Sequence, residues 1–190
     1  MDTISAVGGR RSIRQFSQKK IGKKVLLDLA DGARMAPSAA NLQPLHFLIV
    51  NDSDISARIS ATLKWATHLG NWEPKKNKVA PAFIIILFDS VLKPSGYEYE
   101  AGMAAENIMV CAASMGLGSC CLSVFNKKRM NKMLEIPERY VPILAIALGH
   151  PAEKSVVEEE VGSLKYWRDN EGNMHVPKRS AKSIVHYNSF

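Results

Sequence analysis

The feature that most restricts the fold is the stretch YEYEAGMAAENIMVCAASMGL at 97–117, which has the pattern of a long helix with apolar or small residues on almost every side. Such a helix must be enclosed on most of its sides. In a chain of 190 residues this predicts a central helix and favours a dimer interface. Its small residues permit close helix packing: Ala101, Gly102, Ala104, Ala105, Ala112 and Ala113.

Other elements are predicted on both sides of this helix. Apolar spacing predicts a helix over 22–36 that Pro37 ends, and capping residues at 51–53 predict another over 54–65. The run AFIIILF at 82–88 is typical of a central strand buried on both faces. The remaining predicted elements are strands at 45–51, 119–125 and 140–149, a helix near 127–135, and loops at 37–44 and 66–81, the second a candidate lid.

The net charge of +7 limits which classes of partner the chain is expected to bind. A basic protein can bind nucleic acid, an acidic surface or a phosphorylated small molecule. The positive charge gathers near the two ends, at Arg10, Arg11, Arg14 and the lysines that follow, and at Lys178, Arg179 and Lys182. The two basic ends either converge on one phosphate or form solvated faces, and the sequence leaves both interpretations open.

Composition favours one folded domain over 1–190, with an extended arm over 150–190. At 46% hydrophobic residues the chain can bury a sizeable core, yet no stretch approaches the roughly 20 apolar residues of a membrane span. The N-terminus lacks the apolar core of a signal peptide, so a cytoplasmic location is expected. Cys111, Cys120 and Cys121 lack metal-ligand spacing and are expected to be reduced, mostly buried thiols.

The motif RRSIR at 10–14 is the first candidate binding site. Its three guanidiniums and one hydroxyl suit a phosphate, because arginine forks match phosphate oxygens. In an extended segment Arg10, Ser12 and Arg14 face one way and Arg11 faces the other. A solvent-facing basic stretch or a nucleic-acid contact is the competing interpretation.

Two further motifs suit a flat polar ligand. In PSAANLQP at 37–44, Ser38, Asn41 and Gln43 can bond a polyol or a heterocycle edge, although ordinary turn chemistry is the commoner explanation of such residues taken alone. GLGSCCLS at 116–123 is a helix-to-strand turn that a flat ligand can approach. No nucleophile motif is seen in the sequence. The histidines have neither the spacing of metal ligands nor that of a catalytic triad. This pattern suits an enzyme whose cofactor does the chemistry.

In this order the motifs resemble the nitroreductase family of FMN enzymes over nearly the whole chain. The segments that carry the resemblance are RRSIRQF at 10–16, APSAANLQP at 36–44, the strand from 80, YEYEAGMAAENIMVCAASMGLGSC at 97–120, ALGHP at 147–151 and VPKR at 176–179. The resemblance implies an α+β fold with a mostly antiparallel central sheet flanked by helices. It also implies an intertwined homodimer with an FMN at each subunit interface and a C-terminal arm.

The resemblance assigns every candidate site residue to FMN and none to a metal. Arg10, Ser12 and Arg179 are expected to hold the phosphate and ribityl chain, with Arg11 and Lys178 nearby, and Arg14 to reach the pyrimidine edge. From the partner subunit, Pro37, Ser38 and Asn41 are expected to join the site. Backbone and side chain at Cys121, Leu122 and Ser123 are expected to line the ring near N5. Arg14 and Ser123 are expected to tune the flavin.

The implied activity is an oxidoreductase with ping-pong hydride transfer from NADH or NADPH through flavin N5 to a small-molecule acceptor such as a nitroaromatic or quinone. A related flavin reaction, namely reductive dehalogenation or flavin reduction, and a non-catalytic FMN sensor remain alternatives. Neither nucleic acid nor a membrane is an expected partner. The family's usual tryptophans are replaced by Leu45 and Cys121, and its usual glycine by Ser123, which bears on the substrate.

Overall fold

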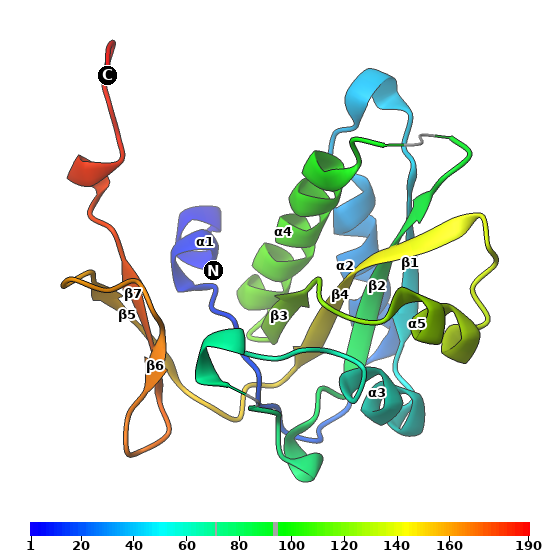
Figure 1. Ribbon diagram of the computed structural model, residues 1–190, viewed down its shortest axis with the longest axis horizontal. Coiled ribbons are helices and arrows are strands. Elements are labelled where there is room, and N and C mark those ends of the chain that lie inside the picture. The colour runs from blue at the N-terminus through cyan, green and yellow to red at the C-terminus, as the bar shows by residue number, and fades with distance from the viewer. Residues whose placement is uncertain (71, 93–94) are drawn as a thin grey trace.

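The central layer is a four-stranded antiparallel sheet with strand order β1-β2-β4-β3 (Figure 1). The computed structural model describes residues 1–70, 72–92 and 95–190, so part of the predicted 66–81 loop, residue 71, lies outside the described residues. The strands are β1 (Leu45–Val50), β2 (Ala82–Asp89), β3 (Gly118–Leu122) and β4 (Tyr140–Gly149). This arrangement confirms the predicted α+β fold with an antiparallel central sheet.

Strand β2 is buried along its whole length because helices cover both faces of the sheet. Ile84 and Ile86 point into the core shared with one helix pair, whereas Phe83 and Ile85 point into the opposite core. The first pair is α2 (Lys23–Arg34) and α4 (Glu98–Ser114), and the second is α3 (Ser53–Ser60) and α5 (Lys127–Leu134) (Figure 1). The expectation of a strand buried on both faces is confirmed.

Helix α4 is the long helix predicted from the sequence, and one side of it packs against α2 and the sheet. Ala104, Ile108 and Ala112 are fully buried there, and the Asn107 Nδ2 donates a hydrogen bond of 3.0 Å to the carbonyl of Gly32. The other side is open, since Met103 is 39% exposed. A single chain therefore encloses only part of this nearly all-apolar helix.

A short helix that the sequence pattern did not reveal, α1 (Thr3–Gly9), precedes the basic segment. The Asp2 carboxylate caps it by accepting a hydrogen bond from the backbone N–H of Ser5 at 3.0 Å. The chain then runs extended across the end of the sheet, where Ser12 bridges to Ser119 and Phe16 bridges to Pro151. The basic segment is thus fixed against the start of β3.

The C-terminal arm is more structured than expected, because it forms a second sheet of order β5-β7-β6. Its strands are β5 (Ser155–Glu159), β6 (Trp167–Arg168) and β7 (Met174–Lys178). Beyond β7 the chain projects away from the main body (Figure 1). Among the described residues, no helix has both the length and the apolar character needed to cross a membrane.

Candidate functional site

The basic segment 10–14 concentrates positive charge beside α1 and α4. Arg10 Nε lies 3.0 Å from Glu106 Oε1, so this arginine is already paired. Among the described residues, Arg11 donates to backbone carbonyls, at Gly8 over 2.6 Å and at Arg10. Burial, and then the charge of Arg10, lower the pKa of the Arg11 guanidinium. An anion bound beside the pair would relieve this repulsion.

The start of β3 lies directly against this basic segment. The Ile13 N–H donates a hydrogen bond of 2.8 Å to the Ser119 carbonyl. A Cβ added to Gly118 would lie 2.9 Å from Ile13 Cβ, so glycine permits the approach. A cavity of about 290 Å³ opens between the two motifs, and its lining includes Arg10, Arg11, Gly118, Ser119, Glu153 and Ser155. The structure therefore brings RRSIR and GLGS together around one cavity.

Arg14 lies on the other side of the same segment, next to the arm. Its guanidinium Cζ lies 5.0 Å from the centre of the Tyr166 ring, and its Nη1 reaches the Ser12 carbonyl at 3.4 Å. Its backbone N–H donates to the carboxylate of Glu153, whose side chain is only 2% exposed. Glu153 also pairs with Arg168 of β6. One buried carboxylate thus ties the basic segment to the arm.

The end of β3 forms the wall of a larger, mainly apolar cavity of about 490 Å³. Cys121 and Ser123 line it together with α4, whereas the Leu122 side chain points into the opposite core. This alternation follows from strand geometry, so a contribution of Leu122 to the site would come from its backbone. Burial raises the pKa of the Cys121 thiol to about 11, which keeps it neutral at ordinary pH.

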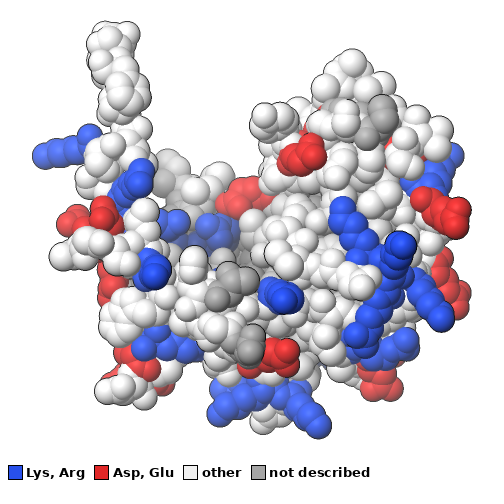
Figure 2. Space-filling view, viewed as in Figure 1, with Lys and Arg blue, Asp and Glu red and all other residues white. Residues whose placement is uncertain are grey.

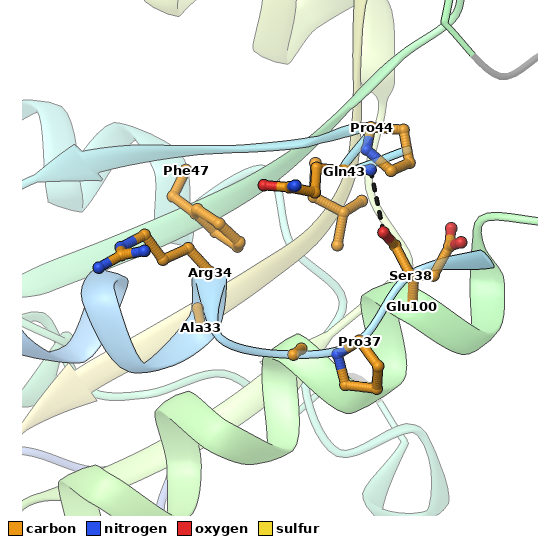
Figure 3. Close-up of a pocket in the computed structure, with 10 residues that line it drawn as sticks. Ala33, Arg34, Pro37, Ser38, Gln43, Pro44, Phe47 and Glu100 are labelled. Atoms are coloured by element: carbon orange, nitrogen blue, oxygen red, sulfur yellow. Dashed lines mark hydrogen bonds between the residues drawn. The ribbon is translucent and has the colours of Figure 1, made fainter. Parts of the chain in front are cut away.

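The 37–44 loop is ordered, as the sequence predicted, and surrounds a smaller cavity of about 100 Å³ (Figure 3). The Ser38 Oγ accepts a hydrogen bond of 2.9 Å from the Gln43 N–H, and the Glu100 carboxylate accepts one of 2.9 Å from the Ala39 N–H. Asn41 accepts a hydrogen bond of 3.1 Å from the Gln43 side chain. Pro37 and Ser38 line this small cavity rather than the one beside β3.

Lys178 and Arg179, at the end of β7, are exposed. Figure 2 shows a hollow between the C-terminal segment and the main body, with both basic and acidic side chains along it. Basic side chains also gather over α3 and α5, where Arg58, Arg129 and Lys132 line a separate hollow (Figure 2). The positive charge is therefore shared between the candidate site and solvated faces.

Three residues at the site were not identified from the sequence. Glu153 and Tyr166 fall in the polar stretch after 150, where no periodic pattern indicates a buried contact. Glu106 gave a usable signal, because a lone acid in the middle of an apolar helix commonly marks a paired cation.

Comparison with known proteins identifies relatives along most of the chain. A sequence profile of the nitroreductase family matches residues 7–150. A relative from Archaeoglobus fulgidus, named for NADH dehydrogenase and NAD(P)H nitroreductase, is 31% identical over 160 residues, covering 80% of this chain and 87% of that one. An NAD(P)H-dependent FMN reductase from Bacillus subtilis is 23% identical over 176 residues, covering 81% and 68%. The solved structure of an FMN-dependent nitroreductase from Clostridium difficile superposes with a TM-score of 0.70 and 26% identity, covering 98% of this chain and 99% of that one.

Proposed function

Because the chain belongs to the nitroreductase family, we propose that it is an FMN-dependent oxidoreductase that takes electrons from NAD(P)H. The observation that carries this proposal is the junction of RRSIR with the start of β3. There, two adjacent guanidiniums line one cavity, Glu106 pairs with Arg10, and the carboxylate of Glu153 at the same cavity is taken up by Arg168. A phosphate monoester supplies the missing negative charge.

The donors present fit FMN. The Ser155 Oγ is buried at the cavity beside RRSIR and, within the described part of the chain, has no hydrogen-bond partner. The Nε of Arg14 is likewise buried without a hydrogen-bond partner among the described residues. We assign the phosphate and ribityl chain to Arg10, Ser12 and Arg179, with Arg11 and Lys178 nearby. Arg14 is assigned to the pyrimidine edge, and Cys121, Leu122 and Ser123 to the ring.

When bound, FMN supplies the redox chemistry, accepting hydride equivalents from NAD(P)H and delivering electrons to an acceptor. Arg14, placed at the pyrimidine edge, would stabilise negative charge there. The neutral thiol of Cys121 offers an uncharged wall that does not act as a nucleophile. Donor and acceptor use the same open cavity in turn, which gives ping-pong kinetics. Its apolar lining suits flat aromatic acceptors such as nitroaromatics and quinones.

The proposed active form is a homodimer of a single FMN-binding domain, 1–190. The open side of α4, where Met103 is exposed, supports this proposal because a second chain would cover it. In that dimer, the 37–44 loop of one subunit supplies Pro37, Ser38 and Asn41 to the site of the other. The arm over 150–190 extends across the partner.

The test is the visible spectrum of the purified protein after incubation with FMN and removal of free cofactor. Flavin absorption near about 450 nm is expected, and it should bleach when NADH or NADPH is added without oxygen. The faster donor identifies the coenzyme, and parallel double-reciprocal plots support ping-pong order. A protein that never retains FMN would overturn the proposal. Bound FMN that neither coenzyme reduces would replace it with a sensing role.

A further inference from the structure

Arg14 and Arg11 both differ from the arginines that carboxylates pair, and Arg11 donates instead to the backbone carbonyls of Gly8 and Arg10. Arg10, Arg139 and Arg168 each form an ion pair with a carboxylate. Over residues 1–70, 72–92 and 95–190, the Arg14 side chain forms none. Its Nη1 makes one long contact of 3.4 Å with the Ser12 carbonyl, and its buried Nε has no partner in that same part of the chain. Most of its donors therefore remain available to a ligand.

The main side-chain contact of Arg14 is the ring of Tyr166, whose centre lies 5.0 Å from the guanidinium carbon. The ring is itself fixed from the other direction. The His68 ring meets it edge-on with centres 5.2 Å apart, and the His68 N–H donates to its Oη at 3.5 Å. Two residues later, Arg168 pairs with Glu153, which also accepts hydrogen bonds from the backbone N–H groups of Arg14 and Gln15.

This geometry fixes a cation without neutralising it. A guanidinium over an aromatic face is attracted by the ring quadrupole, and the ring carries no net charge. A carboxylate in the same place would cancel the field that Arg14 projects into the site. The nearest carboxylate, Glu153, is already paired with Arg168, and it bonds Arg14 through the backbone.

We propose that Tyr166 is a positioning residue that sets the reduction potential of the bound cofactor by holding the charge of Arg14 in place. This rests on the proposed function, since it requires Arg14 to face FMN. The ring comes from the arm and the guanidinium from the N-terminal segment, so the arm contributes to the site through electrostatics as well as through Lys178 and Arg179. The 66–70 segment joins the same contact through His68.

The experiment measures the dissociation constant and the two-electron reduction potential of FMN in the full-length protein. Tyr166→Leu removes the ring, and Tyr166→Phe keeps it while losing the contact of Oη with His68. We expect Tyr166→Leu to weaken FMN binding about threefold to tenfold and to lower the potential. A tenfold loss specific to the reduced cofactor corresponds to about 30 mV. Tyr166→Phe should stay within about twofold of the unsubstituted protein.

A second replacement guards against loss of folding in Tyr166→Leu. Pentafluorophenylalanine at position 166 keeps the shape of the ring but removes its negative face, so it should reproduce the lower potential. In an Arg14→Ala background, Tyr166→Leu should cause no further change in potential, because the two residues act through one contact. Trp167→Leu, next to Tyr166 but stacked on His175, serves as the arm control and should leave the potential unchanged.

The outcomes separate the two proposals. An unsubstituted protein that does not bind FMN overturns the proposed function and this inference with it. A protein that binds FMN with the same potential in the Leu and pentafluorophenyl variants overturns the inference alone. A shift that persists in the Arg14→Ala background also overturns it, because Tyr166 would then act by another route.

Discussion

At the scale of single residues, Glu106 competes with any ligand of Arg10. Its carboxylate lies 3.0 Å from the guanidinium and is about half exposed, so water screens the pair and limits its strength. A phosphate that binds Arg10 must share or displace this carboxylate. We therefore expect Glu106 to reduce the affinity of the proposed site for anions while orienting Arg10.

Replacing Glu106 by glutamine should strengthen FMN binding about twofold to fivefold, because the cost of breaking a half-exposed ion pair is removed. Titration of the apoprotein with FMN, followed by quenching of flavin fluorescence, measures the change. Glu138→Gln, an exposed carboxylate beyond α5, makes the same change of net charge away from the site and controls for general electrostatics. Weaker binding in Glu106→Gln would mean that the carboxylate supports the site instead.

Gly149 is a second position where one residue decides the packing. A Cβ there would lie 2.7 Å from Phe16 Cδ1 and 2.7 Å from Pro81 Cδ, with no flexible chain end to move aside. Gly149→Ala should therefore lower the free energy of unfolding by about 1–3 kcal/mol, measured by urea denaturation. Gly8→Ala, in α1 with nothing within 4 Å of its added Cβ, should be neutral or slightly stabilising. Equal stability of the two variants would contradict this account.

Single residues also show how far sequence reasoning reached into the site. The structure joins Arg10 and Arg11 with the GLGS turn in one cavity, and places Cys121 and Ser123 on one wall. The roles of these residues toward FMN, and those of Pro37, Ser38 and Asn41, remain predictions. Glu153 and Tyr166 could not be predicted, because their burial depends on partners some 139 and 152 positions away.

At the scale of elements, the arm sheet is organised around His175. Its Nδ1 bonds to Glu158 of β5, its Nε2 lies 3.1 Å from the Asp169 carboxylate, and its ring stacks on Trp167 at 4.1 Å. Asp169 first, and then Glu158, raise the pKa of His175 above its ordinary 6.5. The side chain of Asn173 first, and then that of His175, lower the pKa of Asp169 to about 2.

These pKa directions predict a pH range in which the arm sheet is most stable. The stability contributed by protonated His175 is fully present below about pH 6.5 and is lost as the pH rises through its raised folded pKa. That contributed by Asp169 is present above about pH 3.8 and is lost as the pH falls toward about 2. Amide protection in β5 and β7, taken as the exchange rate relative to the intrinsic rate at each pH, should thus be greatest between these limits. His175→Phe keeps a ring against Trp167 and should abolish the loss of stability as the pH rises. His186→Phe should leave that loss of stability unchanged.

The elements differ in how well periodicity predicted them. β2 and α4 have long apolar runs whose pattern follows from burial in this fold, and both were found within a few residues of their bounds. Helix α1 buries only Ala6, so it has no apolar stripe to detect. Strands β5 to β7 pair through their backbones and bury only the side chain of Met174, so they leave no alternating apolar pattern in the sequence.

At the scale of the whole molecule, two apolar surfaces lack a cover within the described chain. One is the outer side of α4, with Met103 and Tyr99 exposed. The other is the projecting C-terminal segment, where Ile184, Val185, Tyr187 and Phe190 are exposed (Figure 1). A second copy of the chain can cover both at once, because each surface is present in each copy. Both the exposed side of α4 and the C-terminal segment therefore lack a cover within the described part of one chain.

Removing residues 181–190 should weaken the dimer without unfolding the subunit, because this segment is exposed and lies outside both cores. Light scattering across a concentration series is expected to show a dimer for the full chain and a shift toward monomer for the shortened one, with unchanged helix content. FMN affinity should fall in parallel if the dimer completes the site. Val161→Ser, an exposed apolar residue elsewhere on the arm, should change neither quantity. A full chain that stays monomeric at high concentration, or a shortened chain that dimerises as tightly, would show that the open side of α4 is covered in some other way.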